Sequence, residues 1–194
     1  MPPAFRPARL PDASALAVLV DIAGEGMPNF MWSTLAAPGQ STLELGRERA
    51  RREAGGFSYR HATVAEIDGE IAGSLVGYRL DDPYDLGALD EMPEIVRPLV
   101  RLEAKAPSSW YVNVLATFPE FRGQGIGGRL LDIAEQKGRE ERAPALSVVV
   151  GSWNGGAARL YGRAGYEAVS SEPAMIFPGC PHEGDWVLMV RSLS

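Results

Sequence analysis

One segment of the chain reads Phe118-Pro119-Glu120-Phe121-Arg122-Gly123-Gln124-Gly125-Ile126-Gly127-Gly128. It follows an apolar, strand-like run from Trp110 to Leu115 and opens into an amphipathic helical pattern. The glycines leave the backbone bare, so successive N–H groups can converge on one spot in front of a helix N-terminus. This segment, called the glycine loop below, predicts a site for the phosphate oxygens of a ligand.

Two other phosphate-binding loops do not fit the glycine loop. A Walker A loop requires a Lys followed by Ser or Thr after its last glycine, and no such pair occurs here. A dinucleotide fingerprint requires G-x-G-x-x-G and an acidic residue at the end of the next strand. The glycines instead read G-x-G-x-G-G, and the next apolar strand ends Val150-Gly151-Ser152. A nucleotide-hydrolysing domain, which would bind ATP with magnesium, is therefore disfavoured.

Length and charge restrict the class of protein. A chain of 194 residues, 45% hydrophobic and 23% charged, suits one soluble α/β domain with a substantial core. The net charge of -6 argues against a nucleic-acid partner, which would require a basic patch. Acidic residues gather between Asp81 and Glu94, which fits either a solvated loop or a surface for a cationic partner.

The reactive residue types are sparse. Cys180 is the single cysteine, so no internal disulfide can form, and its place in a Pro/Gly-rich turn indicates no redox role. The two histidines, His61 and His182, lie too far apart in sequence for a metal site, so we expect no metal. The N-terminus lacks the apolar core of a signal peptide, and no apolar run approaches membrane-spanning length. We expect a cytoplasmic protein without a membrane partner.

Helices and strands follow from local signals. Residues 5–10 read as a first strand, and Asp12 is placed to cap a helix that stops at Gly24. Ser41-Thr42-Leu43-Glu44 has the spacing of a capping box and predicts a second, largely exposed helix as far as Gly55. Between these helices, residues 25–40 carry Met27, Phe30, Met31 and Trp32, which we assign to the core rather than to a substrate pocket.

A hairpin and a long connection come next. Asp68-Gly69 joins two strand patterns, residues 59–67 and 70–80, with the residue types that a tight turn requires. Gly73 and Gly77 predict a bulge or close packing in the second strand. Residues 81–108 read as a binding loop or lid with a short helix. The other expected elements are a helix from 126, a strand at 146–150, a helix at 155–164 and short strands at 174–177 and 186–190.

The glycine loop and a second segment together resemble one family. Leu115 to Gly127 is similar to the acyl-CoA signature of the GNAT superfamily of N-acyltransferases, R/Q-x-x-G-x-G/A, with Arg122, Gly125 and Gly127 on its positions. Asn154 to Tyr166 resembles the family pattern N-x-x-A-x-x-L-Y-x-x-x-G-F/Y. The resemblance covers nearly the whole chain and implies one domain, residues 1–194. Its expected fold is α/β: a mixed, mostly antiparallel sheet of about seven strands, splayed between strands 4 and 5 and flanked by helices.

The resemblance also implies roles for named residues. The N–H groups of Gly123, Gln124, Gly125, Ile126, Gly127 and Gly128, with Arg122, would hold the CoA pyrophosphate. Leu115, Ala116 and Thr117 would bond the pantetheine arm and polarise the thioester carbonyl. Asn154 would contact the pantetheine from the far side, and it is also a good helix N-cap. Tyr161 would protonate the leaving CoA thiolate, although an aromatic residue on a short helix also suits packing.

The general base is not given by the motifs. Asn113 occupies the fourth strand where a carboxylate would be convenient, and an amide accepts no proton at neutral pH. Glu103, Asp90 and Glu91 lie in the long connection, and backbone carbonyls with water are a further route for the proton. We choose Glu103, just before the strand.

The resemblance implies an enzyme that moves an acetyl group from acetyl-CoA to a primary amine by direct attack. The alternative is a non-catalytic domain that binds or senses acyl-CoA. The acceptor, a small-molecule amine or a peptide amine, would be set by residues 24–40 and 81–108, whose acidic run favours a cation. The final strand offers a sheet edge at which a second copy of the chain could pair as a homodimer.

Overall fold

The structure, a computed structural model, describes residues 2–180 and 182–193. The strands in this part of the chain are β1 (Ala4–Pro7), β2 (Ala62–Ile67), β3 (Glu70–Arg79), β4 (Trp110–Thr117), β5 (Ala145–Gly151), β6 (Glu167–Pro173) and β7 (Asp185–Ser192). Its α-helices are α1 (Ala13–Ala23), α2 (Met27–Leu35), α3 (Thr42–Ala50), α4 (Arg97–Glu103), α5 (Ile126–Glu140) and α6 (Gly155–Arg163).

The strands form one seven-stranded sheet in the order β1-β2-β3-β4-β5-β7-β6. The β4–β5 pair is parallel, with Trp110 to Val112 opposite Leu146 to Val148, and the pairs β1–β2, β2–β3, β5–β7 and β6–β7 are antiparallel. This mixed sheet confirms the predicted fold class. The splay between β4 and β5 stays a prediction.

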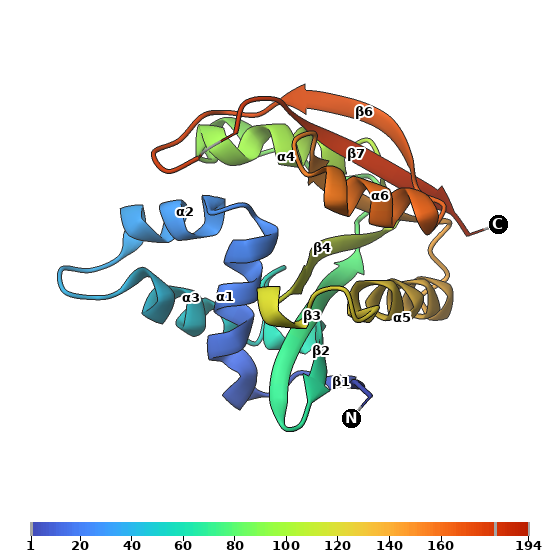
Figure 1. Ribbon diagram of the computed structural model, residues 1–194. Helices are drawn as coiled ribbons and strands as arrows, with labels where there is room; N and C mark the ends of the chain where they lie inside the picture. Colours follow the sequence, from blue (N-terminus) through green and yellow to red (C-terminus); the bar gives the residue numbers. More distant parts are fainter. Residues whose placement is uncertain (1, 181, 194) are drawn as a thin grey trace. The chain divides into compact units, whose positions relative to one another are not determined.

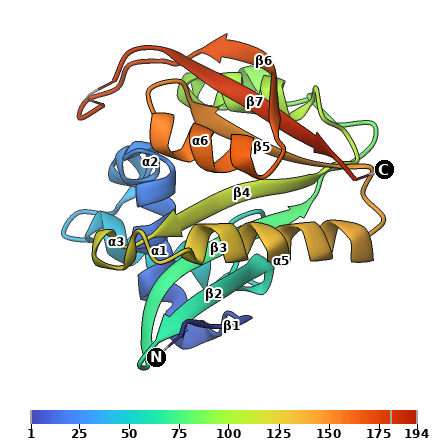
Figure 2. The same ribbon diagram turned by 45° about the vertical axis from the view of Figure 1, so that its right-hand side comes forward.

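The contacts divide the described chain into two compact units. Unit 1 contains residues 2–77, 113–130 and 178–180, and unit 2 contains residues 78–112, 131–177 and 182–193. In unit 1, β1, β2 and β3 lie side by side (Figure 2), and helices α1 to α3 pack together (Figure 1). Its core is built from small and branched side chains, among them Leu16, Val20, Val64, Val76 and Val114.

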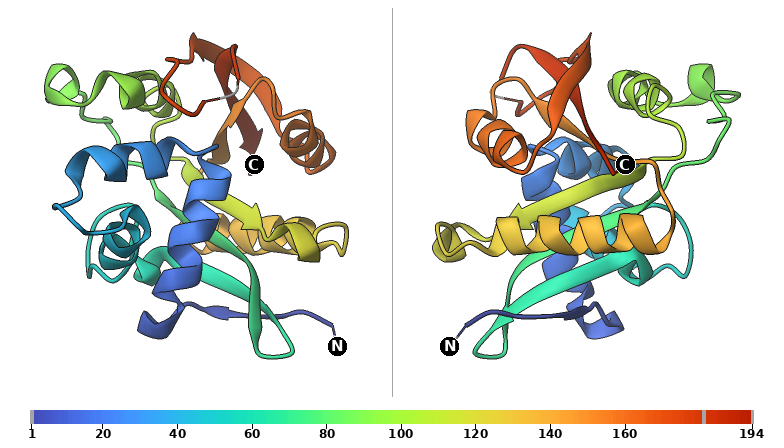
Figure 3. Two further views of the ribbon diagram at one scale, coloured as in Figure 1. Left: turned by 60° about the vertical axis from the view of Figure 1, so that its left-hand side comes forward. Right: turned by 90° about the vertical axis from the view of Figure 1, so that its right-hand side faces the viewer.

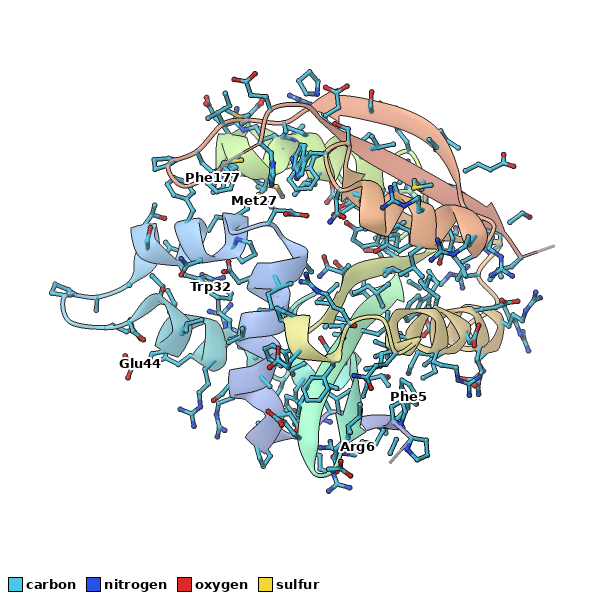
Figure 4. All side chains as sticks on the ribbon, viewed as in Figure 1. Phe5, Arg6, Met27, Trp32, Glu44 and Phe177 are labelled. Atoms are coloured by element: carbon cyan, nitrogen blue, oxygen red, sulfur yellow. The ribbon has the colours of Figure 1, made fainter. Side chains whose placement is uncertain are left out.

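Helix α2 was not predicted as a helix. It begins after Gly26, whose φ of 84° only glycine adopts readily, and Pro28 in its first turn fits a helix start. Trp32 lies between α2 and α3 (Figure 4), stacked on Phe57 at 6.2 Å, and a Cβ at Gly46 would come within 2.5 Å of its ring. Met27 and Trp32 are buried, which confirms their assignment to the core, whereas Phe30 and Met31 are only half-buried.

Other local predictions in unit 1 had mixed outcomes. The capping box is confirmed, because Ser41 Oγ accepts the Glu44 N–H at 3.1 Å and the Glu44 carboxylate accepts the Ser41 N–H at 2.9 Å. Helix α3 ends at Ala50, before the glycines that were expected to stop it. The Asp68-Gly69 turn has φ values of 52° and 85°, as a tight hairpin requires.

Asp12 does not cap α1 with its side chain, contrary to the prediction. Its carboxylate instead accepts two bonds from the Arg6 guanidinium, at 2.8 and 3.1 Å, and the Arg9 N–H at 2.7 Å. Arg6, labelled in Figure 4, also donates to Glu66 at 2.8 Å. One guanidinium thereby ties β1 to β2 and to the start of α1.

Unit 2 is built on β5, β7 and β6. The expected strand at 174–177 is wrong: those residues lie outside any strand, and the strand is β6, residues Glu167–Pro173. Glu172 on β6 pairs with Lys105 at 3.2 Å, which ties the segment after α4 to this edge strand. In Figure 3, right, β6 and β7 pass between α4 and α6, so these helices lie on opposite faces of this part of the sheet.

The final strand is not a free edge. β7 pairs with β5 over Gly151 to Ala145 and with β6 on its other side, so it lies inside the sheet. The proposed pairing of the final strand with a second copy of the chain is therefore wrong, and the edge strands are β1 and β6. In the part of the chain that the structure describes, no helix is long and apolar enough to cross a membrane.

The Asp12 carboxylate gives a pH-dependent prediction for stability. Burial raises the pKa of Asp12, but the bonds from Arg6 and Arg9 outweigh burial and leave this pKa below its ordinary value. A lowered pKa stabilises the fold above the pKa of the unfolded chain, about 3.9, and the gain is lost as pH falls through the folded value. We expect Asp12→Asn to lower the free energy of unfolding by about 2 kcal/mol at pH 7.

Urea denaturation at several pH values measures this effect. The difference between Asp12→Asn and the parent should shrink steadily below about pH 4, as the parent's carboxyl becomes protonated. The matched control is Asp68→Asn in the exposed hairpin turn, where Asn also accepts a positive φ. An Asp12→Asn difference that stays constant from pH 7 to pH 3 would contradict the prediction.

Candidate active site

The site in unit 1 starts from an irregularity in β3. Ala65 pairs with Gly73 and Glu66 pairs with Ile71, so Ala72 is an extra residue that bulges from the strand. The Ala72 carbonyl accepts the Phe118 N–H at 2.9 Å. A Cβ on Gly73 would lie 2.7 Å from the Ala116 carbonyl oxygen. The bulge and the close packing predicted at Gly73 are both confirmed, and together they fix where β4 gives way to the glycine loop.

Leu115, Ala116 and Thr117 are the last three residues of β4. Ala116 is buried, whereas Leu115 and Thr117 are half-buried on the other face of the strand. The Arg122 Nε donates to the Thr117 carbonyl at 3.3 Å, after a short 3-10 turn over Pro119–Phe121. Arg122 therefore closes the glycine loop onto the end of β4 through its side chain.

The middle of the glycine loop is open. Gly123 and Gly125 have φ values of 76° and 78°, and a Cβ on either would meet nothing within 4 Å. Gly123, Gln124 and Gly125 are exposed, whereas the Ile126 side chain is buried and anchors the first residue of α5. A side chain at Gly123 or Gly125 would be strained by the backbone conformation and not by crowding.

Helix α5 supplies hydrogen-bond donors to this open loop. The first backbone bond from its N-terminal turn is Arg129 N–H to Gly125 O, at 3.2 Å. The N–H groups of the residues before Arg129, Ile126 to Gly128, stand in the first turn of the helix and have no intrahelical acceptor. An exposed loop of small residues at the N-terminus of a 15-residue helix can bind an anion.

Asn154 is the N-cap of α6 in unit 2. Its Oδ1 accepts the Ala157 N–H at 3.0 Å, and its own N–H donates to the Gly151 carbonyl at 2.9 Å, directly after β5. The structural role expected of Asn154 is confirmed. Its contact with a ligand stays a prediction.

Tyr161 follows two turns later on α6 and is buried, at 5% exposed. Its ring lies 5.7 Å from the ring of Tyr166. Burial, and to a smaller extent the neighbouring Tyr166, raises the pKa of the Tyr161 hydroxyl above its ordinary value. The hydroxyl therefore stays protonated at neutral pH and can act as a proton donor.

Glu103 ends α4, on the other face of β6 and β7 from α6 (Figure 3). Its carboxylate accepts the Tyr84 hydroxyl at 2.6 Å and is also hydrogen-bonded to Tyr111. Burial raises the pKa of Glu103, and the two tyrosine bonds offset this only in part. A carboxyl with a raised pKa takes up a proton more readily at neutral pH than an exposed one.

The other candidates for the base are placed differently. Asn113 lies half-buried on β4, while Asp90 and Glu91 lie exposed on a 3-10 turn. The Asp90 carbonyl accepts Arg97 Nη2 at 2.8 Å, which holds this turn to the start of α4. Glu103, by contrast, is half-buried and has a raised pKa.

The sequence reasoning missed the tyrosines around Glu103. Tyr84 lies 19 residues before it, and Tyr111 belongs to β4. Tyr78, near the end of β3, meets Tyr111 edge-on at 6.0 Å. No local pattern connects these positions, and the only available signal was the alternation that places Tyr111 and Asn113 on one face of β4.

The remaining reactive side chains form no metal site. His182 stacks on Trp153 at 5.6 Å, and Trp153 meets Trp186 at 5.0 Å. Cys180 is half-buried. Within residues 2–180 and 182–193, no group of three or more His, Cys, Asp or Glu side chains could hold a metal ion.

Each unit thus brings together part of the predicted set. Unit 1 joins Leu115, Ala116 and Thr117 to the glycine loop through Arg122 and the β3 bulge. Unit 2 places Asn154 and Tyr161 on α6 and Glu103 on α4.

Comparison with known proteins gives a family and a fold. The model of the Acetyltransferase (GNAT) family matches residues 29–166. No curated protein matches the sequence significantly. Solved structures match over nearly the whole chain, and at these identities they establish the fold alone.

Three of these structures illustrate the match. One described as an acetyltransferase is 23% identical, with a TM-score of 0.66, and the alignment covers 98% of this chain and 100% of that chain. YncA of Salmonella typhimurium, a putative acetyltransferase solved with acetyl-CoA, is 16% identical, with coverage of 100% and 95% and a TM-score of 0.61. A Drosophila melanogaster polyamine N-acetyltransferase that forms N-acetylagmatine is 18% identical, with coverage of 98% and 100% and a TM-score of 0.64.

The cap at Asn154 can be tested by stability alone. Asn154→Ala removes the acceptor of the Ala157 N–H and should lower the free energy of unfolding by about 1 kcal/mol in urea denaturation. Asn154→Asp keeps a capping oxygen and should stay close to the parent. Ser41→Ala, which removes the cap of α3, is the matched comparison for size of effect. Equal stability of Asn154→Ala and the parent would show that the cap contributes nothing.

Proposed function

Because the chain belongs to the GNAT acetyltransferase family, we propose that it transfers an acetyl group from acetyl-CoA to a primary amine by direct attack. The observation that carries the proposal is the glycine loop: exposed, free of side chains at Gly123 and Gly125, and followed by the N-terminal turn of α5, whose first N–H groups have no acceptor within the helix. Loops with these properties suit the pyrophosphate of CoA.

The acetyl-CoA site is proposed from the same residues as the motif. Gly123, Gln124, Gly125, Ile126, Gly127 and Gly128 offer N–H groups to the phosphates, and Arg122 braces the loop against Thr117. Leu115, Ala116 and Thr117 offer backbone groups to the pantetheine arm, and Asn154 adds its amide. Acetyl-CoA is a co-substrate in this scheme, and no metal takes part in it.

The reaction needs a base and an acid. The acceptor ammonium gives one proton to the Glu103 carboxylate, and the neutral nitrogen then attacks the thioester carbonyl carbon. As the C–N bond forms and the C–S bond breaks, the thiolate takes the Tyr161 hydroxyl proton. The raised pKa of Glu103 suits the first transfer, and a phenol that is protonated at neutral pH suits the second. The nitrogen of the new amide then loses its second proton, which restores the Tyr161 hydroxyl directly or through water, and the proton taken by Glu103 passes to solvent.

A cationic amine is the acceptor class we favour. Residues 81–94 carry Asp and Glu at 81, 82, 85, 90, 91 and 94, and these acidic residues are exposed. An acidic surface raises the local concentration of cations near it. The Drosophila protein of the same fold acts on agmatine or polyamines, which belong to this class. A peptide amine is the second acceptor kind within the same proposal.

Release of free CoA thiol from acetyl-CoA across a panel of diamines, polyamines, amino sugars and peptide amines tests the proposal. We expect release with at least one amine, and Glu103→Gln should lower kcat by about 100-fold or more because it removes the base. Tyr161→Phe should lower kcat with little change in KM. Glu53→Gln is the matched control, because Glu53 is an exposed carboxylate that also accepts a tyrosine hydroxyl.

Binding and catalysis are separated by calorimetry. Gly125→Ala should weaken CoA binding because the backbone there has a positive φ, whereas Gly162→Ala, at an exposed helical position with free space outside the proposed site, is the matched control. CoA binding without thiol release for any amine would favour the non-catalytic acyl-CoA-binding alternative. Absence of CoA binding would overturn the proposal.

A further inference from the structure

Two tyrosine side chains lie next to the Glu103 carboxylate. The Glu103 carboxylate is reached by hydroxyls from two separate segments: Tyr84 from the connection of residues 81–93, at 2.6 Å, and Tyr111 from β4. Tyr78 near the end of β3 packs edge-on against Tyr111. All four residues belong to unit 2. We call Glu103, Tyr78, Tyr84 and Tyr111 the Glu103 cluster.

The carboxylate keeps capacity for a substrate. An ionised carboxylate accepts about four hydrogen bonds, and the two tyrosines use two of them. Burial raises the pKa of Tyr111 and of Tyr84, and the adjacent Glu103 raises both further, so both phenols keep their protons and act only as donors. The tyrosines can therefore orient Glu103 without competing for the proton that it accepts.

Other charged groups near α4 are engaged elsewhere. Lys105 donates to Ser170 at 2.9 Å and pairs with Glu172, and Arg101 lies 3.9 Å from the same Glu172 on β6. Arg97 donates to the carbonyls of Met92 and Asp90. Asp81 adds a negative charge on the side of Tyr84. The basic side chains of α4 and of the residues just after it therefore bind partners on β6 and on the backbone of the connection.

Packing alone would not favour a carboxylate at this position. Burying a charged group costs free energy, and an apolar side chain would pack among the same three rings without that cost. The two phenol hydroxyls reduce the cost and also fix the direction of the carboxylate. Because Tyr84 comes from residues 81–93, a connection with no strand and one short 3-10 turn, the orientation of the carboxylate depends on where this connection lies.

We propose that Tyr84 and Tyr111 are positioning residues for the general base: they hold the Glu103 carboxylate with its remaining lone pairs toward the acceptor amine, and Tyr84 makes that orientation depend on the 81–93 connection. This inference rests on the acetyl transfer proposed above. In the step, the acceptor nitrogen loses one proton to Glu103, and both phenols keep their O–H bonds.

The test is the pH profile of kcat/KM for Tyr84→Phe. The Tyr84 hydroxyl stabilises the charged carboxylate, so its removal should move the acidic limb of the profile to higher pH. Below the limb, kcat/KM should fall about tenfold, because a hydrogen bond to a charged group is worth about 1.5 kcal/mol and tenfold corresponds to about 1.4 kcal/mol. Above the limb kcat/KM should stay below that of the parent, because the ionised carboxylate is no longer held in one orientation, with the KM for acetyl-CoA unchanged. Tyr111→Phe should act in the same direction.

Two comparisons separate positioning from packing. Tyr59→Phe removes the same hydroxyl from an exposed Tyr–Glu contact, 3.0 Å between Tyr59 Oη and Glu53, and should leave the profile unchanged. In a Glu103→Gln background, Tyr84→Phe should cause no further loss. A Tyr84→Phe profile that matches the parent, both in height and in the position of the acidic limb, would overturn the inference. So would an equal loss in the Glu103→Gln background.

A second readout separates this inference from the proposed function. Carbon-13 NMR titration of the Glu103 carboxyl follows its protonation directly, with no turnover. If no amine is acetylated, the proposed acetyl transfer fails; an upward movement of the Glu103 titration in Tyr84→Phe then still supports positioning of the carboxylate. An unchanged titration, with or without enzyme activity, overturns the role of Tyr84.

Discussion

The bulge of β3 against the end of β4 is the contact on which the rest of unit 1's site depends. The displaced Ala72 carbonyl takes the Phe118 N–H, and Gly73 has no side chain where the Ala116 carbonyl comes closest. Because both contacts involve backbone atoms, they fix the last residues of β4 regardless of the side chains there. The glycine loop therefore leaves β4 from a rigid base, with Arg122 as a second brace onto Thr117.

Burial tunes the two proposed proton-transfer groups for different tasks. For Glu103, burial raises the pKa and makes a carboxyl a better base near neutral pH. For Tyr161, the same physical cause keeps a phenol protonated and so available as a donor. In the proposed transfer, one group receives a proton from the acceptor, and the other supplies a proton to the leaving thiolate.

Short-range patterns in the sequence were sufficient to predict much of the fold. The Asp68-Gly69 turn, the capping box at Ser41 and the periodic helix after the glycine loop all follow from short-range chemistry, and all appear in the structure. Strand β6 was misplaced because its seven residues include few apolar side chains and mostly face solvent, as an edge strand allows. Helix α2 depends on Trp32 packing against Gly46, a contact between two helices.

For the candidate site, as for the fold, residues within one stretch of sequence could be predicted, whereas contacts between distant segments could not. The motif residues on β4, the glycine loop and α6 could be predicted because each lies in one continuous stretch of sequence. Asp12 was expected to cap a helix, but the Arg6 guanidinium outside that helix engages its carboxylate. The Tyr84 contact of Glu103 joins residues 19 positions apart through an irregular connection, and such a contact leaves no periodic pattern in the sequence.

The position of β7 has a consequence for synthesis of the chain. Its residues, Asp185–Ser192, lie between β5 and β6, although both of those strands are made earlier. Until β7 has emerged, β6 lacks the strand with which it pairs and β5 is paired on one side only, with β4, whereas strands β1, β2 and β3 can pair once residue 79 has emerged. Domains generally fold from the N-terminus during synthesis. A nascent chain stalled short of residue 185 would therefore expose the edges of β5 and β6 that β7 covers, and these edges are where a chaperone would bind.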